Sequence, residues 1–106
     1  MGNNVNIWDT GKRNRILFVA RRLSRRNSRY DFALKRVKIF DGPGSFTKGS
    51  VYGSTNRKDV WIDIDVCKTD KQVEKTMAHE LEHVLGENDC DKIEKRIKEQ
   101  GIGNDL

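Results

Sequence analysis

The sequence is poor in the residues that mark several classes of protein. It has one proline and two cysteines among 106 residues, which excludes collagen-like chains, low-complexity chains and disulfide scaffolds. No apolar run approaches the ~20 residues that a membrane-spanning helix requires. Residues 1–10 also lack the basic and then apolar pattern of a secretory signal. We therefore expect a cytoplasmic protein with no membrane contact.

The two cysteines are predicted to be free thiols. Cys67 and Cys90 flank a predicted helix over residues 70–86, whose ends would lie roughly 25 Å apart at ~1.5 Å per residue. A disulfide requires Cα atoms within ~7 Å of each other. A bridge would force the chain to fold back along the whole helix, so reduced thiols are expected.

Hydrophobic and charged residues are equally abundant, at 35% each. A chain of 106 residues with this composition has room for one thin core under a heavily ionic surface. We therefore treat residues 1–106 as one domain, and we expect it to be a monomer.

Charge is distributed unevenly along the chain. Residues 1–58 contain fourteen Lys/Arg and three Asp, a net charge of +11. Residues 59–106 contain seven Lys/Arg and thirteen Asp/Glu, a net charge of −6. This asymmetry favours weak, non-specific contact of the first half with an anionic partner such as nucleic acid. A solvated basic face without a partner is the alternative.

Apolar periodicity predicts an α+β fold. Its expected elements are helices over residues 10–28, 70–86 and 91–100 and strands over residues 32–40, 50–52 and 60–66. The first helix is amphipathic with an arginine-rich outer face, and the strands form a small three-stranded sheet. Thr69 and Gln72 fit a capping box at the start of the second helix, and Gly86 suits a left-handed cap at its end.

The segment from His79 to His83 contains both histidines of the chain in an H-E-x-x-H pattern. Histidines at i and i+4 lie one turn apart on one helical face, so both imidazoles can bind the same cation. Steps of 100° per residue place them on a polar face away from the apolar side, with Glu80 at its border and Glu82 at a charged margin. Glu80 is predicted to polarise a metal-bound water without being a ligand. Zn²⁺ is the expected metal, because it accepts imidazole and carboxylate and leaves a position for water.

The stretch from His79 to Asp89, H-E-L-E-H-V-L-G-E-N-D, resembles the active-site helix and following turn of the zincin metallopeptidases. In several zincin branches the third ligand lies six residues after the second histidine, beyond a glycine that ends the helix. Gly86 and Asp89 occupy these positions, so the resemblance implies Asp89 as the third ligand. The same spacing occurs in SprT-like and WLM-type peptidases, which act on DNA-bound proteins.

The chain departs from the longer zincins after the motif. No methionine follows Gly86, so the Met-turn of the metzincins is absent, and only 17 residues follow Asp89. The chain is therefore more similar to minimal zincins such as the minigluzincins, in which the next helix carries the third ligand. Asp89 also has an ordinary interpretation as a helix cap. The alternatives to Asp89 as ligand are Asp91, Glu94, Glu87 and Cys90.

These observations together predict zinc-dependent peptide hydrolysis in a minimal zincin-like domain. His79, His83 and Asp89 would hold the metal, and Glu80 would be the general base and then the proton donor to the leaving amine. The segment around Val51 would pair with an extended peptide or protein substrate by strand addition. Tyr30 or Tyr52 could donate a hydrogen bond to the oxyanion, although a tyrosine packed on the sheet is the commoner case.

Two functions of other classes stay open. One is a metal-dependent endoribonuclease similar to the small bacterial rRNA-maturation enzymes, which share His-x-x-x-His and a third ligand six residues on. It suits the basic first half but leaves Glu80 without a role. The other is a nucleic-acid-binding domain with a structural zinc in a closed four-ligand site, for which Cys90 is the obvious fourth ligand.

Overall fold

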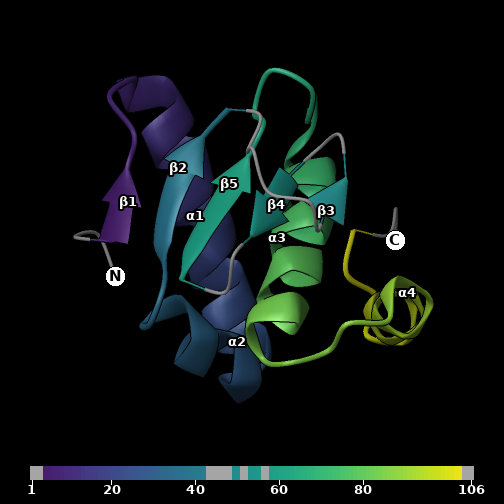
Figure 1. Cartoon of the computed structure of the whole chain (residues 1–106). Coiled ribbons are helices and arrows are strands. Elements are labelled where there is room, and N and C mark those ends of the chain that lie inside the picture. The colour runs from purple at the N-terminus through teal and green to yellow at the C-terminus, as the bar shows by residue number, and fades with distance from the viewer. Residues whose placement is uncertain (1–3, 43–48, 51–52, 56–57, 104–106) are drawn as a thin grey trace.

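The computed structural model describes residues 4–42, 49–50, 53–55 and 58–103, which form an α+β domain (Figure 1). This confirms the predicted fold class. The described helices are α1 (Thr10–Arg26), α2 (Ser28–Leu34), α3 (Asp70–Val84) and α4 (Cys90–Glu99). The described strands are β1 (Val5–Asn6), β2 (Lys38–Asp41), β3 (Gly49–Ser50), β4 (Gly53–Thr55) and β5 (Asp59–Ile62).

The strands form one sheet in the order β1-β2-β5-β4-β3. β1, β2 and β5 run parallel, with Val5 opposite Ile39 and Ile39 opposite Val60. β4 and β3 add an antiparallel hairpin to the edge of β5. The sheet is thus larger than the predicted three strands, because β1 and β4 are too short to show a period in the sequence.

The core lies between one face of the sheet and the helices α1 and α3, which are behind the sheet in Figure 1. The sheet contributes the buried side chains of Val5, Ile39, Val60 and Ile62. The apolar stripes of the two helices cover them with Ile16, Val19, Ala20, Leu23, Val73, Met77, Ala78 and Leu81. Within the described segments, no helix combines the length and apolar character needed to cross a membrane.

Two predicted strands are wrong in extent. Residues 32–34 of the predicted 32–40 strand belong to α2, because Asn27 ends α1 and its side chain accepts the amide of Arg29 to start a new helix. β5 ends at Ile62, since the Asp63 carbonyl accepts the amides of Val66 and Cys67 in a turn. Of the predicted strand over residues 50–52, Ser50 lies in β3 and the other two residues lie outside the described part of the chain.

The predicted end caps of α3, Thr69 and Gly86, are confirmed, but the capping box is only half formed, because the Gln72 side chain donates to Thr76 Oγ1 at 3.2 Å. The Thr69 hydroxyl accepts the amide of Gln72 at 3.1 Å, and Gly86 follows the helix with φ +105°. The Gly86 amide donates to the His83 carbonyl and the Glu87 amide to the Glu82 carbonyl, at 3.1 and 3.0 Å. This pair of bonds is a Schellman motif. It turns the chain back over the end of α3 and leads it into α4.

Acidic side chains of the second half pair with several basic side chains of the first half. These ion pairs join Lys12 to Asp65, Arg15 to Asp70, Arg22 and Arg26 to Glu74, and Arg29 to Glu82, and Lys12 also binds Asp41 within the first half. The charge asymmetry of the sequence therefore has an internal use, in packing α1 and α2 against α3.

Candidate metal centre

The two histidines of α3 lie side by side, as their spacing predicts. Their ring centroids are 5.0 Å apart. His79 is half-buried, whereas His83 is only 2% exposed and does not face an open polar surface as expected. His83 is covered because residues 87–90 pass close to its ring on the way into α4.

The third residue of the cluster is Cys90. Its Sγ atom lies 3.6 Å from His83 Nε2. The potential ligand atoms of His79, His83 and Cys90 all lie within 4.8 Å of one another. Imidazole nitrogen and thiolate sulfur are the two donors that zinc prefers in proteins. These three side chains could therefore hold a metal ion by their chemistry and by their closeness.

Asp89, the predicted third ligand, has a different place in the structure. Its Oδ1 atom accepts the amides of Asp91 at 2.9 Å and Lys92 at 3.4 Å, which makes Asp89 the N-cap of α4. A carboxylate in this position satisfies free N–H groups and interacts favourably with the helix dipole. Asp91 lies exposed in the first turn. The side chain that the structure brings to the two histidines is that of the next residue, Cys90.

Both imidazoles have an acceptor at Nδ1. His83 Nδ1 lies 2.7 Å from the Glu87 carbonyl oxygen, which can only accept, so Nδ1 carries the hydrogen and Nε2 is left as the ligand atom. His79 Nδ1 lies 3.3 Å from Glu94 Oε1. Burial lowers the pKa of His79 against the opposing effect of Glu94, and the neutral imidazole is the form that binds metal.

Glu80 is buried beside this cluster without a partner. Glu80 is only 1% exposed, and neither of its carboxylate oxygens has a hydrogen-bond partner in the described part of the chain. Burial raises the pKa of Glu80 to about 8. Burial and the nearby Glu80 carboxylate also raise the pKa of the Cys90 thiol, so the two side chains share one region.

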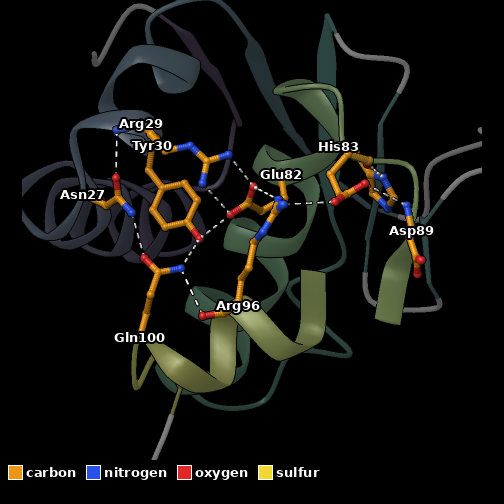
Figure 2. A network of polar contacts seen from close by, with 9 residues as sticks. Asn27, Arg29, Tyr30, Glu82, His83, Asp89, Arg96 and Gln100 are labelled. Atoms are coloured by element: carbon orange, nitrogen blue, oxygen red, sulfur yellow. Dashed lines mark hydrogen bonds and ion pairs between the residues drawn. The ribbon is translucent and has the colours of Figure 1, made fainter. Parts of the chain in front are cut away.

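The other two buried glutamates of α3 are both paired. Glu74 binds Arg22 and Arg26 at 3.4 and 3.2 Å. Glu82, predicted at an exposed margin, is fully buried and accepts the Tyr30 hydroxyl at 3.0 Å (Figure 2). Leaving a buried polar group unpaired costs about 1–3 kcal/mol, more when it is charged. Glu80 is thus the exception that a structural role does not explain.

Tyr30 has a structural role. Its ring is fully buried, its hydroxyl donates to Glu82, and burial raises its pKa to about 12. The packed interpretation of this tyrosine is therefore the one that the structure supports. Val51 and Tyr52, proposed for substrate binding and oxyanion stabilisation, lie outside the described residues.

The cluster is open to solvent on the side of Cys90, which is an exposed free thiol. It joins two imidazoles, one thiol and one buried carboxyl at the point where α3 meets the start of α4. Comparisons of the chain with protein-family models, curated proteins and solved structures gave no match.

Proposed function

We propose that this protein is a zinc-dependent peptidase whose metal is held by His79, His83 and Cys90. The observation that supports it most directly is Glu80, a buried and unpaired carboxyl next to a candidate metal-binding histidine. A purely structural zinc needs no such group, whereas hydrolysis needs a general base within reach of the attacking water. The resemblance of the H-E-x-x-H stretch to zincins points the same way.

In this proposal Glu80 moves the protons. Zinc at the site would polarise the scissile carbonyl and lower the pKa of a water toward ~7. Burial holds Glu80 protonated at neutral pH, and a cation nearby lowers the pKa of a carboxyl. Glu80 would therefore become a proton acceptor when the cluster is loaded. It would take a proton from the attacking water and donate it to the leaving amine.

The test is the substitution Glu80→Gln, which keeps size and removes basicity. We expect it to retain zinc and melting temperature and to lose peptide cleavage by ~100-fold or more. Glu99→Gln, an exposed glutamate on α4, is the matched control and should cleave like wild type. Cleavage of no member of a peptide library by zinc-loaded wild type, or equal cleavage by Glu80→Gln, would overturn the proposal.

A structural zinc in a nucleic-acid-binding domain is the second candidate. It is favoured by the exposed Glu94, whose Oε1 atom lies 3.3 Å from His79 Nδ1; if Glu94 left this nitrogen and turned to the metal, it would complete a closed set of four ligands. X-ray absorption of the zinc-loaded protein distinguishes the two. Three protein ligands and a light solvent atom support the peptidase, whereas loss of one oxygen ligand in Glu94→Gln supports the closed site. RNA cleavage that Glu80→Gln leaves intact would favour the endoribonuclease.

A further inference from the structure

We propose that Arg96 is a positioning residue for the metal centre. It acts through Glu82 and Glu87 and contacts neither the metal nor a proposed ligand. It ties a buried anchor on α3 to the α3–α4 connection, and thereby sets the orientation of His83 and the place of Cys90. Figure 2 shows this network of polar contacts. The inference rests on the proposed metal centre and names what holds it in shape.

The anchor is Glu82. Its side chain is 0% exposed and accepts hydrogen bonds from the Tyr30 hydroxyl and from Arg29 Nη2, both at 3.0 Å. Arg96 Nη1 approaches the same carboxylate at 3.5 Å. A buried carboxylate with several donors is a fixed point, because removal of a partner leaves a buried charge uncompensated.

The other end of the Arg96 guanidinium holds Glu87. Arg96 Nη2 lies 3.2 Å from Glu87 Oε1. The second carboxylate oxygen of Glu87 accepts the Asp89 amide at 3.4 Å, and the Glu87 amide donates to the Glu82 carbonyl at 3.0 Å. Glu87, considered as a ligand from the sequence, is thus held at both its side chain and its backbone.

The remaining polar atom of Glu87 acts on the metal centre. Its carbonyl oxygen accepts His83 Nδ1–H at 2.7 Å and so directs Nε2 toward Cys90 Sγ, 3.6 Å away. An outer partner of this kind sets the tautomer and ring orientation of a metal-binding histidine. If Arg96 releases Glu87, the acceptor of His83 and the start of α4 both move.

Arg96 is itself held in place from α2. Gln100 Nε2 donates to the Arg96 carbonyl at 3.2 Å and to the Tyr30 hydroxyl at 3.0 Å. Asn27 Nδ2 donates to Gln100 Oε1 at 2.8 Å. The backbone of α4 near Arg96 is therefore joined to the same buried tyrosine that binds Glu82. One network links α2, α3 and α4 behind the ligands.

The test compares Arg96→Met with Arg26→Met. Arg26 is a matched control, because it is 40% exposed against 41% for Arg96 and also pairs with a buried glutamate of α3, at the side away from Cys90. Zinc affinity is measured by competition with a chelator. The tautomer of His83 is measured by long-range ¹H–¹⁵N NMR on metal-free protein, at a pH where both imidazoles are neutral.

We expect Arg96→Met to weaken zinc binding by about 10- to 100-fold and to lower the share of the Nδ1–H tautomer of His83. Arg26→Met should change neither. Arg96→Lys should lie between wild type and Arg96→Met, since an ammonium cannot bridge two carboxylates as a guanidinium does. It also keeps the test valid if the methionine variant does not fold.

Equal zinc affinity and an unchanged His83 tautomer in the Arg96 variants would overturn the inference, as would a wild type that binds no zinc. Peptide cleavage is not among these measurements. A wild type that binds zinc in an Arg96-dependent way but cleaves no peptide would overturn the peptidase and support the inference.

Discussion

The three buried glutamates of α3 show how one side chain takes different roles within three turns of a helix. Glu74 and Glu82 face arginines from neighbouring helices, whereas Glu80 meets none. The paired residues hold helices together, and breaking a buried pair leaves an uncompensated charge. The unpaired residue has its pKa raised by burial, and in the proposed mechanism it becomes a proton acceptor only when a nearby cation lowers that pKa.

Asp89 and Cys90 are neighbours in the sequence, and their substitution should change different properties. We expect the Asp89 variant to lose stability and the Cys90 variant to lose zinc affinity. Asp89→Ala removes the cap of α4, so we expect a loss of about 0.5–2 kcal/mol in the free energy of unfolding with zinc affinity near that of wild type. Cys90→Ser removes the proposed thiol ligand from an exposed position, so zinc affinity should fall at least ~10-fold while stability of the metal-free protein changes little.

Urea unfolding with a chelator present and zinc competition measure the two quantities. A wild-type zinc affinity in Cys90→Ser together with a large loss in Asp89→Ala would return Asp89 to the role of third ligand.

At the scale of elements, the end of α3 is the part of the fold on which the site depends most. The Schellman motif closes the helix and delivers the Glu87 carbonyl to His83 within one turn. The positive φ of Gly86 makes this turn possible, because residues with a Cβ rarely adopt it.

Gly86→Ala should therefore affect both stability and metal binding. A Cβ at this position meets no atom within 4 Å, so the cost is backbone strain alone, about 1–2 kcal/mol. A shift of the turn that relieves the strain also moves Glu87, and zinc affinity should fall as well.

Gly101→Ala is the matched control for that variant. Gly101 has φ +70° and equally free surroundings, but it follows the other end of α4. It should show a similar loss in urea unfolding and a wild-type zinc affinity. Equal zinc affinities in the two variants would contradict the role given to the turn.

At the scale of the whole molecule, ion pairs between the basic and acidic halves limit how much charge is left for a partner. All four arginines are exposed on α1, but Arg22 and Arg26 pair with Glu74, whereas Arg21 and Arg25 form no ion pair among the described residues. The expected contact with nucleic acid would therefore depend on fewer residues than the sequence alone indicates.

We expect weak binding of duplex DNA at low salt, with a log–log slope against salt of about −2 for two phosphate contacts at ~0.9 each. The double variant Arg21→Gln, Arg25→Gln should remove most of it, and Lys92→Gln, Lys95→Gln on the acidic half should not. Titration of labelled duplex at two salt concentrations measures this. Absence of binding, or binding that both double variants share, would leave the arginines as a solvated face.

The local features of this protein were determined by its sequence. The amphipathic stripe of α1, the caps of α3 and the common face of His79 and His83 depend on residues within one or two turns of one another, so a periodic pattern is enough to predict them. The α+β class follows from the same patterns. Elements of two or three residues, such as β1 and β4, carry no such period, and the sequence did not reveal them.

The side chain that lies beside His83 and the burial of Glu82 were decided only by the tertiary structure. Asp89 and Cys90 differ by one step, and the path of the chain out of α3 determined which of them faces His83. Glu82 appears exposed on an isolated helix, yet Tyr30 and Arg29 reach it from more than fifty residues away. The physical reason is that these contacts depend on how helices cross, and spacing along one helix does not encode the neighbours that cover it.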